Sequence, residues 1–465
     1  MKSHSARPGR PTMSEPSESQ PEYRCPGESE SISRAMHLAR LEALYPACAR
    51  CPHKDDTGQV SSRRARHLAE VHRPPPSPAL FDDEGISGVL LNELTAAVAR
   101  RAAIAFGLHL RDHIDREGWP RVVLAGDARR LTSPLVAAAA EGLRFAGCHV
   151  TDIGQGTTGC LALAMWQSVS DGGLLIGNAT DRHERASLRF WHAGRPLSRG
   201  HELDELESRF HAEANRPTRR YGSLERVSFE AEYLATLAGY YHGLRPLRVV
   251  LDTDCRPLVE YARLLVESLE CRFLHDFDDP RPLADRVVAN RAHFGVRIDG
   301  IGETCRAVDE RGVDVPGERL FGLIAGYLLA QGRHHMFEGD ASRPGQTARD
   351  MADMTAMSAT STTETDNGAT SPALVLEDVA TPEMERILQE LGYRVVRTGG
   401  RRAAMHRAME VEVAPLGAGP SGRFWYNNTG HIVPDALATL SLLLGILSQS
   451  DRPLSDVLDA TSGRT

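Results

Sequence analysis

The sequence predicts an α/β protein with several domains. Its 465 residues leave room for two to four domains of ordinary size. Hydrophobic residues make up 41% of the chain and charged residues 25%, as is typical of globular proteins. Between residues 230 and 275, strand-like apolar segments alternate with helical ones, which is the pattern of a βαβ unit. Length, composition and alternation therefore favour consecutive α/β domains.

Charge and hydropathy argue against two classes of function. The formal net charge is -8 and the pI is about 6.2, whereas a general nucleic-acid binder carries a basic domain. No apolar run approaches the roughly 20 residues that cross a bilayer. Residues 1–20 are rich in Ser, Pro and charge without an apolar core, so they predict neither a signal peptide nor a folded segment. We expect a cytoplasmic protein with no nucleic-acid or membrane partner.

Residues 1–78 predict a flexible arm and linker, disordered up to about residue 22, that carries a group of cysteines. Cys25, Cys48, Cys51 and His53 offer three thiolates and one imidazole, which are the ligand types of a tetrahedral zinc site. The alternative is a set of reduced thiols, because Cys51 and His53 are close for two ligands and no second C-x-x-C exists. The sequence therefore allows either a zinc site or free thiols at these residues, and an iron–sulfur cluster is a third, minor alternative.

Four motifs between residues 81 and 191 occur in the order found in one known family. They read FDDEGISG at 81–88, GDARRLTSP at 126–134, VTDIGQGTT at 150–158 and GGLLIGNATDRHERASLRFW at 172–191. They resemble F-G-T-D-G-I-R-G, G-R-D-T-R-x-S-S-P, V-x-D-L-G-x-x-P-T and the phosphoserine loop of the α-D-phosphohexomutases, the phosphoglucomutase and phosphomannomutase family. The last segment is typical of a strand, a polar loop and a second strand. The resemblance implies three consecutive phosphohexomutase-type α/β domains with mixed sheets around a cleft.

The expected elements fill these domains in order. Domain I covers residues 79–220, domain II 221–312 and domain III 313–458, with a disordered insertion at 336–371. The family's fourth domain, with its phosphate-clamping loop, is expected to be absent. The predicted helices are 92–117, 135–146, 230–241, 259–269, 318–331, 382–391 and 435–448, and the predicted strands include 122–125, 247–252, 272–275, 373–377 and 394–398.

The phosphoserine loop lacks the family's reactive residue. Aligned without gaps, the serine that carries the phosphoryl group falls on Ala179, which has no hydroxyl. Loss of a covalent nucleophile costs on the order of a million-fold in turnover. Thr180 could stand in after a one-residue slip of the loop, or could simply bond its own backbone, and Ser187 is a more distant candidate. The resemblance thus implies a mutase with no intact catalytic residue.

The expected magnesium loop is altered too. Residues 294–312 resemble D-x-G-I-A-x-D-G-D-G-D-R-x-x-x-V-D-E-x-G, in which three aspartates bind Mg²⁺. Asp299 matches the first ligand and Glu303 stands at the third, but the middle one is Ile301, which cannot coordinate. Mg²⁺ manages with one or two carboxylates when a phosphate completes its shell, and Ala179 supplies no phosphoserine. We expect weak or no Mg²⁺ binding, with both carboxylates as solvated turn residues.

The sugar-binding loop is the third altered part. Residues 417–423 lie where the family has G-E-x-S-G-H, and Gly419 replaces the glutamate that grips two vicinal hydroxyls. Arg423 replaces the histidine and could meet an anion. Arg182, Arg185 and Arg189 form an anion site near the first loop or are simply solvated. The expected ligand-binding residues are Arg129, Arg182, Ser421 and Arg423.

These departures favour a non-catalytic phosphohexomutase relative. It would bind a sugar phosphate or another anionic small molecule, or act as an interaction scaffold for a protein partner. The alternative is an active phosphohexomutase, an isomerase-type intramolecular phosphotransferase of carbohydrate metabolism, that uses a displaced hydroxyl such as that of Thr180 or another phosphotransfer reaction. A third hypothesis is a metal-dependent regulatory protein controlled by the N-terminal cysteines.

Overall fold

A computed structural model describes most of the chain, which divides into two compact units, Met1–Pro74 and Pro75–Thr465. The expected disordered start, and nearly all of the expected insertion at 336–371, lie outside the described residues. The described residues are 23–43, 45–58, 68–69, 80–114, 118–179, 184–212, 220–240, 243–267, 269–276, 279–331, 371–428 and 431–462.

The first unit is a small fold around buried sulfur-containing and aromatic side chains. Strand β1 (Tyr23–Arg24) pairs antiparallel with β2 (Ser31–Ile32), and α1 (Arg34–Glu42) and the 3₁₀ helix η1 (Pro46–Arg50) follow. The sequence predicts a flexible arm here. The described residues between 23 and 58 instead contain these regular elements, and the unit has a core of its own. The buried side chains include Tyr23, Cys25, His37, Leu41, Cys48 and Cys51.

Domain I of the second unit contains a mixed sheet in the order β3-β7-β6-β4-β5-β9, with β8 paired to β7. The central strands β4, β5 and β6 are parallel, and β4 and β6 are largely buried, as is usual for strands with helices on both faces. Because β9 pairs with β5, this sheet extends past the predicted boundary at residue 220. The strands are β3 (Ile86–Val89), β4 (Arg121–Gly126), β5 (His149–Gln155), β6 (Gly172–Gly177), β7 (Arg185–His192), β8 (Arg195–Pro196) and β9 (Leu224–Arg226).

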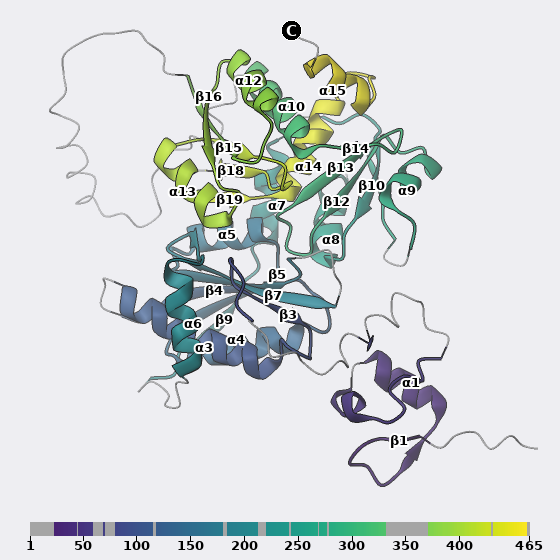
Figure 1. Cartoon of the computed structure of the whole chain (residues 1–465), viewed down its shortest axis with the longest axis vertical. Coiled ribbons are helices and arrows are strands. Elements are labelled where there is room, and N and C mark those ends of the chain that lie inside the picture. The colour runs from purple at the N-terminus through teal and green to yellow at the C-terminus, as the bar shows by residue number, and fades with distance from the viewer. Residues whose placement is uncertain are drawn as a thin grey trace, which may run out of the picture. The chain divides into compact units, whose positions relative to one another are not determined.

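The helices of domain I lie on both faces of its sheet. α3 (Ala96–His113), α4 (Ser133–Phe145) and α6 (Glu202–Ala212) gather on one face, and α5 (Thr158–Gln167) packs against the other (Figure 1). A Cβ atom added at Gly142 would lie 2.4 Å from the carbonyl oxygen of Arg100, so the glycine lets α4 approach α3 closely. α3 also contacts α6, which places the ends of these two helices beside each other.

Domain II is a smaller sheet in the order β11-β10-β12-β13-β14. β10 is parallel to β11 and β12, whereas β12 and β13 form an antiparallel hairpin. The loop of this hairpin contains residues 299–304, the predicted magnesium loop. The elements are α7 (Glu230–Ala238), β10 (Arg248–Asp252), α8 (Arg256–Leu265), β11 (Arg272–Leu274), α9 (Leu283–Ala289), β12 (Phe294–Ile298), β13 (Cys305–Asp309) and β14 (Asp314–Val315).

Domain III repeats the plan with a sheet in the order β16-β15-β17-β18-β19. The predicted sugar-binding loop connects β17 to β18 and meets the magnesium loop, since the N–H of Cys305 donates to the carbonyl of Gly422 (2.8 Å). The elements are α10 (Gly317–Ala330), β15 (Ala373–Glu377), α12 (Pro382–Glu390), β16 (Arg394–Thr398), α13 (Arg402–Glu412), β17 (Leu416–Ala418), β18 (Trp425–Asn428), β19 (His431–Pro434), α14 (Ala436–Leu447) and α15 (Leu454–Ser462).

The predicted fold class is confirmed, because three mixed α/β sheets follow one another along the chain. α3 begins later than predicted because residues 90–94 form a turn and the hydroxyl of Thr95 caps the helix. The sequence did not predict α13, whose fully buried apolar side chains are only Met405 and Met409. In the part of the chain that the structure describes, no helix has the length and apolar character to span a membrane.

Candidate functional site

The predicted nucleophile loop leaves the sheet at the end of β6. The backbone N–H of Asn178 donates to Oδ2 of Asp127 (3.0 Å), and Ala179 packs against the largest hydrophobic core. Ala179 therefore offers only a methyl group where the resemblance implies a serine hydroxyl. Thr180 and Arg182, the expected surrogate nucleophile and anion ligand, lie outside the described residues.

Arg129, an expected ligand-binding residue, has partners within the protein. Its Nε lies 2.6 Å from Oδ2 of Asp127, and its Nη1 donates to the carbonyl of Arg185 (2.9 Å). Asp127 is buried and also accepts a hydrogen bond from the hydroxyl of Thr132 (2.6 Å). The Arg129 charge is thus neutralised by a buried carboxylate that fixes the loop before α4.

Asp299, the first expected magnesium ligand, caps its own loop. One carboxylate oxygen accepts from the N–H groups of Ile301 (3.2 Å) and Glu303 (2.9 Å), and the other from the N–H (3.2 Å) and hydroxyl (2.9 Å) of Thr304. Burial, and next the charge of Glu303, raise the pKa of Asp299 to about 6. Asp299 and Glu303 are buried rather than solvated as predicted, because the tight hairpin turns its N–H groups inward toward an acceptor.

The side chain of Ile301, in the predicted magnesium loop, packs against the end of β6, where the nucleophile loop begins. A Cβ atom at Gly177 would lie 2.6 Å from Cγ2 of Ile301, and the Ile301 carbonyl accepts from the N–H of Thr158 (2.8 Å). The Ile301 side chain is fully buried. The hairpin therefore presents an apolar group between two carboxylates that already have partners, and these residues do not fit Mg²⁺, which needs free oxygen ligands.

Glu303 is the hub of a buried ion-pair network. Its Oε1 lies 2.8 Å from Nη2 of Arg402 and 3.1 Å from the hydroxyl of Thr158, and its Oε2 lies 3.4 Å from Nε of Arg423. The side chains of Glu303 and Arg402 are each 1% exposed. The Arg402 guanidinium carbon lies 4.5 Å from the ring centroid of Trp191, a cation–π distance. Glu303 is thus surrounded by positive charge from domain III.

Arg423 completes this network with a bidentate pair to Glu84. Its Nη1 and Nη2 lie 2.9 Å and 2.7 Å from the two carboxylate oxygens, and the N–H of Arg402 also donates to Glu84 (3.1 Å). Burial opposes the charge, but Arg423 and then Arg402 lower the pKa of Glu84 to about 2. Arg423, which the sequence predicts as an anion ligand, is therefore paired with two carboxylates.

The sugar-binding loop also contains an internal carboxylate. Ser421, a predicted ligand residue, donates its N–H (3.0 Å) and its hydroxyl to Glu377 at the end of β15. A Cβ atom at Gly419 would lie 2.5 Å from the Cβ of Glu377, so Glu377 occupies the space beside that glycine. Glu377 thereby brings a carboxylate to the loop from another strand, and the hydroxyl of Ser421 is already engaged.

Sequence reasoning missed three charged residues of this centre. Glu377 ends the apolar strand ALVLE, and a carboxylate in such a run is a signal for a buried polar group. Glu84 lies in the first motif, at 81–88, where the sequence gives no sign of a partner in a distant segment. Arg402 gave no signal, because the pair of arginines at 401–402 is typical of a solvated surface.

The N-terminal unit contains the predicted zinc ligands. Cys25, Cys48 and Cys51 are buried free thiols, and burial, followed by the neighbouring Cys25 and Cys51, raises the pKa of Cys48 to about 11. The ring of His53 packs edge-on against Tyr23. Among the described residues, these sulfurs are not part of a group of three ligand atoms within 4.8 Å of one another. Zinc at these cysteines stays a prediction.

Comparisons with known proteins agree on one family. Residues 78–217 match the family model described as phosphoglucomutase/phosphomannomutase, alpha/beta/alpha domain I. A phosphoglucosamine mutase from Renibacterium salmoninarum is 30% identical over 275 residues, which cover 55% of this chain and 60% of the relative. A phosphoglucomutase/phosphomannomutase family protein of known structure from Burkholderia thailandensis has a TM-score of 0.66 and 22% identity over 82% of this chain and 79% of its own. Residues 78–217 therefore match domain I of the phosphoglucomutase/phosphomannomutase family, and the chain as a whole has the fold of solved members of that family.

Phosphohexomutases of different substrate names match this chain. A phosphoglucosamine mutase from Nitratidesulfovibrio vulgaris is 25% identical over 406 residues, 81% of this chain and 80% of the relative. A phosphomannomutase from Salmonella typhimurium is 27% identical over 276 residues, 54% of this chain and 59% of the relative. The matches to the Renibacterium and Salmonella proteins span about three-fifths of those relatives. The domain boundaries and the absence of a fourth domain stay predictions.

In this phosphohexomutase relative, the loops that the sequence singles out come together. The turn at Asp127 and the nucleophile loop at Ala179 meet the magnesium hairpin at Ile301, and the hairpin meets the sugar-binding loop at Arg423. Glu84, Glu303, Arg402 and Arg423 then tie domains I, II and III together; we call these four residues the interdomain network.

Proposed function

We propose that this phosphohexomutase relative does not turn over hexose phosphates and acts instead as an interaction scaffold. The observation that supports this proposal is the interdomain network. Arg402 and Arg423 pair with Glu303 and Glu84 across three domains, so the opposite charges of the centre balance one another within the protein. Such pairing favours a fixed arrangement of the three domains, which suits a platform for a protein partner.

The same contacts argue against the parts that phosphoryl transfer requires. The reaction depends on a positioned nucleophile, a cation that neutralises the phosphoryl group, and groups that grip the sugar. Ala179 has no hydroxyl, Ile301 has no ligand atom, and Ser421 already donates to Glu377. A phosphate would also have to displace Asp127 from Arg129 or Glu84 from Arg423. Scaffolding is therefore favoured over binding of a sugar phosphate.

An active mutase is the second candidate, and the relatives favour it. The matching proteins from Renibacterium salmoninarum and Salmonella typhimurium are named phosphoglucosamine mutase and phosphomannomutase. Thr180 follows Ala179 directly and carries the hydroxyl that a displaced nucleophile needs.

A mutase assay separates the two candidates. Purified protein is given glucose, mannose or glucosamine 1-phosphate with Mg²⁺ and a hexose bisphosphate activator. We expect no turnover at a sensitivity of about a millionth of an ordinary rate of roughly 10 per second. Turnover that survives Ala179→Gly but disappears in Thr180→Val would overturn the proposal and identify Thr180 as the nucleophile.

Thermal shift and intact mass test ligand binding without turnover. We expect the melting temperature to stay unchanged with each hexose phosphate, and no phosphoryl adduct to form after incubation with the bisphosphate. Ala179→Ser serves as the matched variant, because it restores the hydroxyl but leaves Ile301 and the interdomain network in place. An adduct in Ala179→Ser would contradict the view that the surrounding groups have also lost the chemistry.

A further inference from the structure

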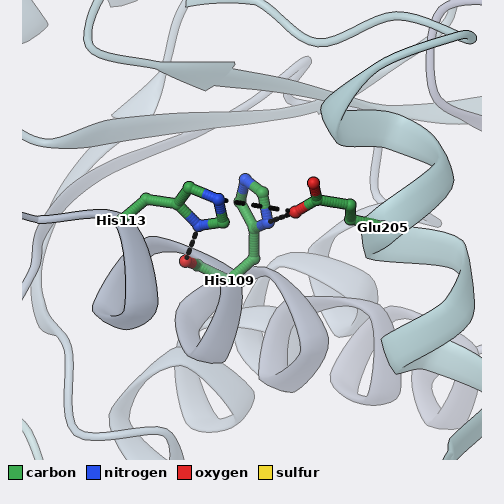
Figure 2. Close-up of side chains that lie close together, drawn as sticks. All are labelled: His109, His113 and Glu205. Carbon is green, nitrogen blue, oxygen red and sulfur yellow. Dashed lines mark hydrogen bonds and ion pairs between the residues drawn. The ribbon is translucent and has the colours of Figure 1, made fainter.

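A group of histidines and glutamates lies between α3 and α6 in domain I, outside the interdomain network. His109 and His113 are one helical turn apart on α3, and Glu205 lies on α6 facing both rings (Figure 2). Their ligand atoms all lie within 4.8 Å of one another. Two imidazoles at this spacing on one face of a helix, opposed by a carboxylate, form a typical set of metal ligands.

The distances in this cluster match those around a small tetrahedral ion. Oε2 of Glu205 lies 3.5 Å from Nδ1 of His109 and 3.4 Å from Nε2 of His113. An ion with bonds of about 2.0–2.1 Å holds tetrahedral ligand atoms roughly 3.3 Å apart. The three atoms can therefore bind one ion after small side-chain rotations.

His109 provides an independent sign that a partner belongs here. Its side chain is 0% exposed, and neither ring nitrogen has a hydrogen-bond partner among the described residues. Buried polar groups are nearly always hydrogen-bonded, and an exception needs an explanation. The His109 and His113 ring centroids are 4.2 Å apart, so a proton on both rings would place two positive charges side by side. A bound cation would use the nitrogen that faces Glu205.

The second nitrogen of each histidine is oriented as a metal ligand requires. Nδ1 of His113 lies 2.8 Å from the carbonyl oxygen of His109, which only accepts, so Nδ1 carries a proton and Nε2 is the nitrogen that faces Glu205. Nε2 of His109 faces Glu202 at 3.5 Å, and Glu202 also contacts Nδ1 of His192 (3.1 Å). Carboxylates and carbonyls in these positions fix the tautomer of metal-binding histidines.

We propose that His109, His113 and Glu205 bind a zinc ion through Nδ1, Nε2 and Oε2, with water in the remaining position. Two imidazoles and one carboxylate suit zinc better than Mg²⁺ or Ca²⁺, which prefer all-oxygen shells. The ion would join the end of α3 to α6. This site is independent of the interdomain network and of the proposed function.

Zinc titration of the full chain tests the proposal. The N-terminal cysteines are a competing site, so the titration uses the Cys48→Ala/Cys51→Ala variant as its parent. We expect this parent to bind one zinc ion per chain by calorimetry and by native mass. Cobalt substitution should give the visible bands of a nitrogen and oxygen site without thiolate charge transfer. A parent that binds no zinc would overturn the proposal.

Single substitutions then locate the ion. His113→Ala and Glu205→Gln should each weaken zinc binding at least about 100-fold, since outer partners alone contribute 10- to 100-fold. His211→Ala, an exposed histidine on α6, is the matched control and should leave affinity unchanged. Metal-free circular dichroism verifies that each variant folds. Loss of binding in His192→Ala with none in His113→Ala would place the ion on the other side of His109 and overturn this ligand assignment.

Discussion

The interdomain network and the histidine cluster of domain I are both polar and at least partly buried, but they differ in their charges: the network pairs arginines with carboxylates at 2.7–3.4 Å, whereas the cluster sets His109 and His113 beside carboxylates at 3.4–3.5 Å. In the network, the side chains of Glu303 and Arg402 are each 1% exposed and lie 2.8 Å apart. In the cluster, His109 is equally buried, yet its nearest carboxylate oxygens are 3.5 Å away and neither nitrogen has a hydrogen-bond partner in the described chain.

This difference affects how much stability the protein is expected to lose when one member of each group is replaced. In the network, removal of one charged member leaves its opposite charge in a buried setting, although Nε, Nη1 and Nη2 of Arg402 make no hydrogen bond to the described residues. The histidine cluster is expected to lose less when His109 becomes apolar, because His109 makes no hydrogen bond to the described residues and its nearest carboxylate oxygens lie 3.5 Å away. Glu84, Glu303 and Arg423, which lie in the family motifs, form ion pairs, whereas the histidine cluster lies outside those motifs.

The largest expected effect comes from neutralising the hub of the network. Glu303→Gln keeps the shape but leaves Arg402 without its carboxylate, and breaking a buried ion pair from one side costs about 3–5 kcal/mol. Urea unfolding measures this loss of free energy. Glu267→Gln, which removes an exposed helical pair with Arg263, is the control and should change stability by less than about 0.5 kcal/mol. A loss below about 1 kcal/mol for Glu303→Gln would contradict the buried network.

The pH dependence of stability tests the other end of the network. The folded pKa of Glu84 is about 2, below its unfolded value of 4.5, so its contribution is fully present above pH 4.5 and is lost as pH falls toward 2. The loss amounts to roughly 3 kcal/mol at most. We expect the gap in unfolding free energy between the native chain and Glu84→Gln to shrink between pH 5 and pH 3. A constant gap would show that Glu84 is not held by Arg423.

The smallest effect is expected in the histidine cluster without metal. His109→Leu replaces a buried ring that has no hydrogen-bond partner among the described residues with an apolar side chain of similar size, so metal-free stability should change by less than about 1 kcal/mol. Zinc should raise the melting temperature of the native chain and have no such effect on His109→Leu. Because the N-terminal cysteines also offer zinc ligands, both chains are compared in the Cys48→Ala/Cys51→Ala background. A large metal-free loss would indicate that His109 is a structural residue.

The sequence by itself determined the α/β class, the position of the motif loops and the residue types that stand at the motif positions. The strands Ala373–Glu377 and Arg394–Thr398 have their predicted bounds, because segments rich in β-branched and apolar residues favour strands. Ala179 and Ile301 are visible from the sequence alone, since a methyl group or an alkyl chain cannot act as nucleophile or ligand in any fold.

Only the tertiary structure decided which charged residues form ion pairs with each other. Glu84 and Arg423 are far apart in the chain, and Arg402 begins a helix with weak apolar periodicity, so neither composition nor spacing predicts their pairing. His109 and His113 have helical spacing, but Glu205 joins them only because α6 packs against α3. Apolar pattern is a local property of the sequence, whereas an ion pair or a metal site depends on distances that packing sets between remote segments.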